Sequence, residues 1–129
     1  MKRVTTSMVL VAAVGLLLVA APAVFVGARF TDYTDIRNLS GETVTDVMLR
    51  LHDHQTDWAI TKRIATLKPG ESLRVRHWHH DTRAVVEFVI AGQKFRHEEA
   101  SIDLWSGEGW RFDIQPSGTV RSGYVHRHR

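Results

Sequence analysis

Histidine is the residue type in this chain whose number and spacing point most directly to chemistry. The sequence contains eight histidines, and five of them fall in two clusters, His52 with His54 and His77 with His79 and His80. In an extended strand, residues i and i+2 lie on the same face, so a His-x-His pair can offer two imidazoles to one metal ion. Two such pairs on neighbouring strands would form a four-coordinate zinc or copper site. One hypothesis is therefore a histidine-based site for copper or zinc.

The alternation of side chains along strands limits this hypothesis. His77 and His79 fall on the apolar face of their predicted strand, whereas His52 and His54 fall on the polar face of theirs. The two pairs can meet only if a strand ends or twists between them, and an aspartate beside either cluster could then add an oxygen ligand. The competing interpretation is that both clusters lie at strand ends, where polar side chains face water.

A second group of residues suits recognition of a partner. Arg74, Arg76 and Trp78 share one outward face of a predicted strand, and Trp105 lies beside a glycine-rich turn. Exposed aromatic side chains on loops enter pockets of partner proteins or stack on sugars, so we expect these four residues to bind a partner, with glycan binding through Trp78 and Trp105 as an alternative. The competing interpretation is that Arg74, Arg76 and Trp78 form an ordinary solvated strand face. Trp110 shares its parity with the apolar residues of the next strand, so we expect it in the core.

Catalytic and nucleic-acid-binding functions find no support in the sequence. The chain has no Gly-x-Ser-x-Gly elbow, no phosphate-binding glycine loop, no His-Glu-x-x-His motif and no cysteine. Of its 17 lysines and arginines, two precede residue 8, which leaves 15 against 14 acidic residues. No basic stripe alternates with aromatic residues. We therefore expect a non-enzymatic protein with no nucleic-acid partner.

The amino terminus predicts the location of the protein. Residues 8–28 form an uncharged apolar run of 21 residues, preceded by Lys2 and Arg3 and followed by Arg29. In a helix this run would extend roughly 30 Å, about the thickness of bilayer hydrocarbon. Its length favours an uncleaved membrane anchor over residues 1–28, whereas the small residues around Pro22 fit a cleaved signal peptide. Either interpretation places residues 29–129 outside the cytoplasm.

The remainder of the chain shows the period-2 alternation of β-strands, interrupted by turn signals. We expect strands over residues 33–38, 44–52, 58–64, 72–77, 83–90, 94–97, 111–115 and 119–126. Seven or eight one-sided strands predict an all-β fold, a small antiparallel immunoglobulin-like β-sandwich preceded by one membrane or signal helix. A small barrel is the alternative architecture. No helix is expected beyond the leader.

Together these observations predict a cell-envelope protein. It would be held in the membrane by residues 8–28, as a single-pass protein, with its β domain on the extracytoplasmic or periplasmic side. Its expected role is that of a binding or accessory module for an envelope protein complex. The alternative is an exported metal-binding protein that uses the five clustered histidines.

Overall fold

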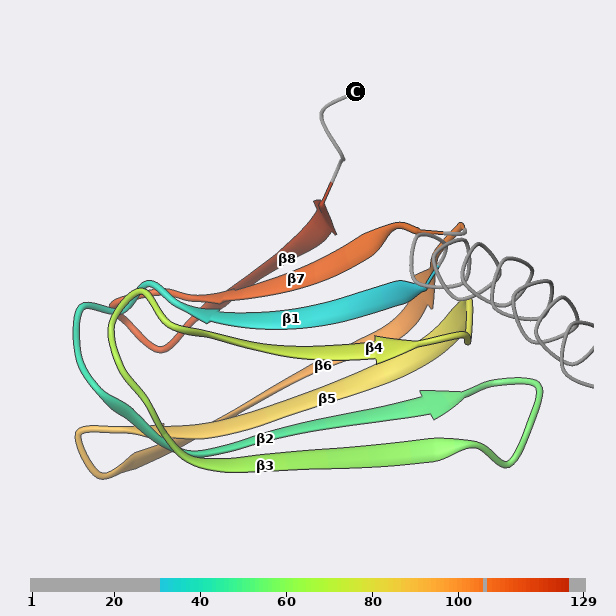
Figure 1. Ribbon diagram of the computed structural model, residues 1–129. Helices are drawn as coiled ribbons and strands as arrows, with labels where there is room; N and C mark the ends of the chain where they lie inside the picture. Colours follow the sequence, from blue (N-terminus) through green and yellow to red (C-terminus); the bar gives the residue numbers. More distant parts are fainter. Residues whose placement is uncertain (1–30, 106, 126–129) are drawn as a thin grey trace, which may run out of the picture. The chain divides into compact units, whose positions relative to one another are not determined.

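The computed structural model describes residues 31–105 and 107–125, which form eight β-strands (Figure 1). The predicted leader, residues 1–28, lies outside the described residues. The strands are β1 (Asp32–Asn38), β2 (Val44–Asp53), β3 (Ala59–Leu67), β4 (Ser72–His77), β5 (Asp81–Ile90), β6 (Gln93–Asp103), β7 (Gly109–Ile114) and β8 (Val120–Val125). Within the described ranges, no helix is long and apolar enough to cross a bilayer.

The strands form two four-stranded sheets. Sheet A has the order β4-β1-β7-β8, and sheet B has the order β3-β2-β5-β6. The two sheets lie one over the other as layers (Figure 1). The predicted β-sandwich is therefore confirmed, and β5 occupies the central position expected for the most apolar strand.

One strand pair corrects the prediction of an antiparallel fold. β1 and β7 pair in parallel, with Ile36 opposite Phe112, while every other pair of neighbouring strands is antiparallel. The strand order also departs from that of an immunoglobulin constant domain, whose sheets join strands one, two, five and four, and three, six and seven. The segment between β1 and β7 is the long crossover that a parallel pair requires. Local alternation carries no information about such a distant pairing.

The core lies between the two sheets. Its largest fully buried side chains include Ile36 and Phe112 from sheet A and Leu49, Leu51 and Phe88 from sheet B, each at most 1% exposed. Trp110 packs against this cluster, as predicted, although it stays partly exposed. Burial of each such side chain stabilises the fold by about 1.5–3 kcal/mol.

Two local features depart from the simple alternation. β6 extends to Asp103, well beyond the predicted end at residue 97, because it continues to pair with β5 through residues that lack an apolar pattern. β2 contains a bulge between Thr45 and Met48, where Asp46 adopts a φ of +50°. Such a bulge bends a strand and increases its twist.

Candidate functional site

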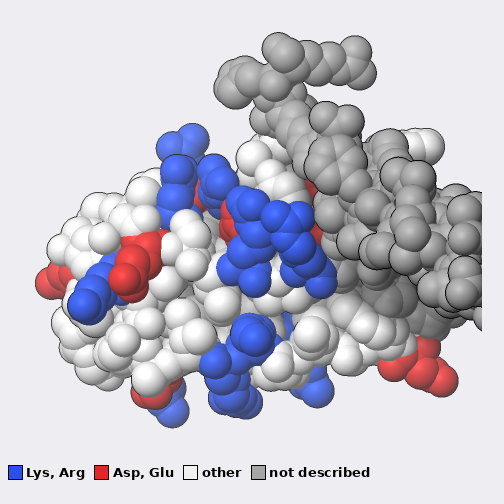
Figure 2. Space-filling model, in the orientation of Figure 1, with Lys and Arg blue, Asp and Glu red and all other residues white. Residues whose placement is uncertain are grey.

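The outer face of sheet A carries a concentration of positive charge. Strand register places Asp35 between Arg74 of β4 and Arg111 of β7, and Arg37 between Ser72 and Asp113. Arg76 and Arg121 occupy the neighbouring positions of the outer strands β4 and β8. We call this surface the arginine face, and its residues are Arg37, Arg74, Arg76, Arg111 and Arg121. Figure 2 shows Lys and Arg side chains gathered over β1, β4 and β7, with acidic side chains beside them.

A buried carboxylate organises this surface. Asp35 is 1% exposed although its strand position faces outward. Arg74 donates to both of its oxygens, Nε to Oδ1 at 2.6 Å and Nη2 to Oδ2 at 2.8 Å, and Arg111 Nη2 reaches Oδ2 at 3.2 Å. The hydrogen bond to Asp35 raises the pKa of Arg74, and the guanidinium also lies 4.0 Å above the ring of Tyr33. Two arginines are thus fixed in place by one acid.

The rest of the arginine face differs in how it is paired. Arg37 makes a bidentate pair with Asp113, with both N–O distances at 2.9 Å, and this hydrogen bonding raises the pKa of Arg37. Arg76 and Arg121 are exposed, and no ion pair joins either of them to an acid among the described residues. Three arginines of this face therefore share two aspartates, and the guanidinium groups of the other two have no acidic partner among the described residues.

The four predicted partner-binding residues divide between two places. Arg74 and Arg76 lie on the arginine face, as their parity predicted. Trp78 and Trp105 lie beyond the ends of β4 and β6 and are 61% and 76% exposed. Their loops touch, because the N–H of Leu104 donates to the carbonyl of His80 at 2.7 Å. The structure thus brings the two tryptophan-bearing loops together at one end of the sandwich. Sequence analysis missed Arg37, Arg111 and Arg121, since their strands are distant along the chain.

The two histidine pairs do not form one site. His52 is exposed on the outer face of sheet B, opposite Ala59 and Arg83. His54 lies beyond the end of β2, and its Nε2 is 2.8 Å from the carbonyl oxygen of Ala100. Among the described residues, no hydrogen bond joins the ring of His52 or His54 to His77, His79 or His80.

His77 is a buried residue with both ring nitrogens engaged. It is 3% exposed, its Nδ1 lies 2.9 Å from the carbonyl oxygen of His79, and its Nε2 lies 3.1 Å from the hydroxyl of Thr34. A carbonyl only accepts, so Nδ1 carries the proton and Nε2 accepts from the hydroxyl in the neutral ring. Burial lowers the pKa of His77 and outweighs the hydrogen bond to the His79 carbonyl, which raises it. A neutral ring satisfied on both sides is a structural histidine.

His79 and His80 are each held by a buried carboxylate. His79 Nδ1 lies 2.6 Å from Asp53 Oδ2, and His80 Nδ1 lies 2.5 Å from Asp32 Oδ2. The indole of Trp58 stacks on His79 with ring centroids 3.9 Å apart. Burial opposes the ionisation of Asp53, but hydrogen bonds from backbone N–H groups and from His79 outweigh it, so the pKa of Asp53 is lowered.

The described histidines do not converge on one cluster of metal ligands. Over residues 31–105 and 107–125, no group of three or more histidine and acidic side chains has an arrangement that could hold a metal ion. The three imidazoles of His77, His79 and His80 do not converge, because each lies against a different partner. The copper or zinc site over the five histidines stays a prediction.

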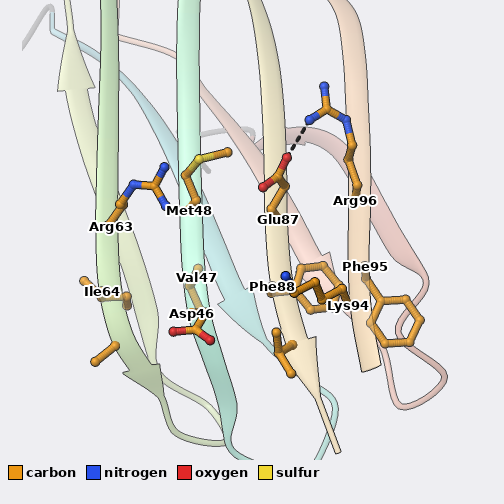
Figure 3. Close-up of a pocket in the computed structure, with 12 residues that line it drawn as sticks. Asp46, Val47, Met48, Arg63, Ile64, Glu87, Phe88, Lys94, Phe95 and Arg96 are labelled. Atoms are coloured by element: carbon orange, nitrogen blue, oxygen red, sulfur yellow. Dashed lines mark hydrogen bonds and ion pairs between the residues drawn. The ribbon is translucent and has the colours of Figure 1, made fainter. Parts of the chain in front are cut away.

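A groove crosses the outer face of sheet B, and sequence analysis did not anticipate it. Arg63, Met48, Glu87 and Arg96 lie side by side on β3, β2, β5 and β6, and Glu87 pairs with Arg96 (Figure 3). The groove has a volume of about 640 Å³, within the range of small-molecule sites. Met48 is only 7% exposed on this face. Its apolar side chain on an otherwise polar strand face was the one signal available.

Comparisons with known proteins give little further information. No protein-family model matches the chain, and no curated protein matches it. Among solved structures, a "putative cell adhesion protein" from Bacteroides ovatus aligns with a TM-score of 0.49 and 8% sequence identity, covering 75% of this chain and 43% of that chain. This chain therefore spans less than half the length of that protein, and nothing about activity transfers at this level of identity.

Proposed function

We propose that this protein is a non-enzymatic binding module of the cell envelope. In this proposal, residues 8–28 hold it in the membrane, and the β-sandwich lies on the extracytoplasmic side as an accessory subunit of an envelope complex. The observation that carries the proposed binding role is the arginine face, with five arginines and two aspartates on one side of one sheet. The partner surface it suits is acidic.

The contacts on this face support recognition of carboxylates or phosphates. Arginine presents a planar fork of donors that matches both groups, and it is enriched at protein interfaces. Asp35 already fixes Arg74 and Arg111, so little side-chain freedom would be lost when a partner binds. Arg76 and Arg121 supply the exposed donors.

The test compares variants of the full-length protein, tagged at its carboxyl terminus and purified from gently solubilised membranes. Arg76→Glu with Arg121→Glu reverses the two solvent-facing charges of the arginine face. The matched control, Arg50→Glu with Arg63→Glu, reverses two exposed charges on the outer face of sheet B.

We expect a near-stoichiometric envelope protein to co-purify with the wild type and the control, and to be lost from the arginine-face variant. The intact mass of the purified chain reports whether residues 1–28 are retained. Equal recovery of the partner with both variants would contradict the proposed binding surface, and a mass lacking the first 28 residues would contradict the anchor.

A second candidate function is metal binding at His79 and His80. The supporting observation is that the Nδ1 of each ring lies close to a buried carboxylate oxygen, at 2.6 Å in a hydrogen bond for His79 and at 2.5 Å in an ion-pair contact for His80. Histidines that bind a metal commonly use one ring nitrogen for it and direct the other to a carboxylate. Added copper or zinc should then raise the melting temperature of the wild type and of His52→Ala with His54→Ala, but not of His79→Ala with His80→Ala. An unchanged wild-type melting curve would rule this function out.

A further inference from the structure

Exposed apolar side chains concentrate at one end of the sandwich. Among the described residues, four large hydrophobic side chains are exposed: Trp78 at 61%, Trp105 at 76%, Tyr124 at 48% and Leu39 at 40%. The first three lie at the end where β4, β6 and β8 finish and β1 and β7 start (Figure 1). Leu39 follows β1 and lies at the opposite end. We call the end that carries the tryptophans the tryptophan end.

The tryptophan end is also the end closest along the chain to the predicted membrane segment. The apolar run finishes at Ala28, and β1 begins at Asp32. Each residue spans at most about 3.6 Å, so the four steps from Ala28 to Asp32 cover no more than about 15 Å. If residues 8–28 occupy the bilayer, covalent geometry keeps this end of the sandwich beside the headgroup layer.

The tryptophans are held outward by well-packed surroundings. Leu104, which precedes Trp105, is 2% exposed, and the N–H of Trp105 donates to the Glu108 carboxylate at 2.9 Å. The N–H of Gly107 donates to the buried Asp32 carboxylate at 2.8 Å, which ties the loop to β1. These contacts hold the backbone at Trp105 and Gly107, so exposure of the Trp105 indole is part of the folded structure.

The same holds for the loop that carries Trp78. Its neighbour His77 is buried, and His79 stacks on Trp58. Trp78 therefore projects from a segment that is fixed on both sides. An indole whose orientation is already fixed loses little conformational entropy when it enters a new environment.

We infer that Trp78 and Trp105 insert into the headgroup layer of the bilayer and orient the sandwich on the membrane. Indole rings favour the membrane interface because they combine an apolar body with a polar N–H. In this orientation the strands rise away from the membrane, and the arginine face points sideways, toward a neighbouring envelope protein. The inference rests on the anchoring in the proposed function.

The experiment exploits the absence of cysteine from the chain. A fluorescent probe is attached to Gln55→Cys, an exposed loop position at the tryptophan end, or to Ser117→Cys, an exposed loop position at the opposite end. The full-length protein is reconstituted in vesicles of phosphatidylcholine and phosphatidylglycerol that contain a headgroup spin label. Each probe is measured with both tryptophans present and with Trp78→Ser and Trp105→Ser together.

We expect the probe at residue 55 to be quenched strongly and the probe at residue 117 weakly. Replacement of both tryptophans should remove roughly half or more of the quenching at residue 55, since the end is then tethered but no longer inserted. Circular dichroism and the melting temperature confirm that the double variant is folded, as expected for two exposed side chains.

Two results would overturn the inference, and they are distinguishable. A chain that alkaline carbonate extracts from the vesicles refutes the anchoring, and the inference with it. A chain that resists extraction but shows equal quenching at both positions, or quenching at residue 55 that does not depend on the tryptophans, refutes the insertion alone.

Discussion

Gly109 lies directly opposite Tyr33 in the parallel pair of β1 and β7, and the tyrosine ring fills the space that a side chain at position 109 would need. A Cβ atom at Gly109 would lie 2.1 Å from Tyr33 Cζ, which no real contact permits. The guanidinium carbon of Arg74 lies over the same ring, 4.0 Å from its centroid. The glycine therefore allows the aromatic ring to lie flat on the sheet beneath the arginine face.

Replacing this glycine should destabilise the protein. We expect Gly109→Ala to lower the free energy of unfolding by about 2–3 kcal/mol, because the added methyl group forces the Tyr33 ring out of its place. The matched control is Gly123→Ala on the neighbouring β8, where a Cβ meets nothing within 4 Å. Urea unfolding of both variants measures the difference. Equal losses from the two would show that the Tyr33 contact is not responsible.

Removing the charge of Asp35 should cost more than removing that of Asp113. We expect Asp35→Asn to destabilise the fold by about 2–3 kcal/mol, since Arg74 and the half-buried Arg111 then lose the buried acid that they share. Asp113 is more exposed and, among the described residues, pairs with Arg37 alone, so Asp113→Asn should cost about 1 kcal/mol or less. Thermal unfolding of the two variants checks the order, and a larger loss from Asp113→Asn would contradict it.

Asn38 should not tolerate replacement by aspartate. It is fully buried, its Nδ2 donates to the carbonyls of Glu42 and Leu67 at 2.7 and 2.8 Å, and its Oδ1 accepts two hydrogen bonds from Ser40. Asn38→Asp turns the donor into an acceptor that faces two carbonyl oxygens, at an expected cost of about 2–4 kcal/mol. Gln115→Glu makes the same chemical change at a less buried site and should be nearly neutral in unfolding experiments.

Stability should fall as the solution is acidified below neutral pH, and His77 should account for part of this fall. The pKa of His77 is lowered in the folded state, so the unfolded chain binds more protons below about pH 6.5, the ordinary value, and stability decreases toward lower pH. His77→Gln, which cannot titrate, should flatten the pH dependence of unfolding in this range. A pH dependence of unfolding that is the same in His77→Gln and in the wild type would contradict the assignment.

A second pH effect should appear at lower values and involve Asp53. Its pKa lies below the usual value, so the stability it contributes is present above about pH 4 and is lost as the pH falls through the lowered pKa. Asp53→Asn removes this contribution at neutral pH. The variant should therefore lose less stability than the wild type between pH 4 and acidic conditions, and an unchanged acid transition would exclude Asp53 as its source.

Local patterns in the sequence predicted the strands and their buried faces well. Residues 72–77 alternate strictly, and Val47, Leu49 and Leu51 alternate with polar residues in the second half of 44–52; both ranges correspond to strands with nearly the same bounds. The carboxyl-terminal half of β6 has no such alternation of apolar residues and was not predicted. Its residues form a strand because they pair with β5. The sequence also predicted the outward position of Arg74 and Arg76, since parity along a strand is a local property.

The sequence by itself determined the all-β class and the apolar residues of the core, because alternation of side chains is set by the backbone of each strand alone. It left a sandwich and a small barrel both open, and the strand order of the two sheets decided for the sandwich. The tertiary structure decided which strands are neighbours, and so created the parallel pair of β1 and β7 and the arginine face. It also directed His77, His79 and His80 to separate partners. Pairing between distant strands depends on how the whole chain packs, and no local pattern records that choice.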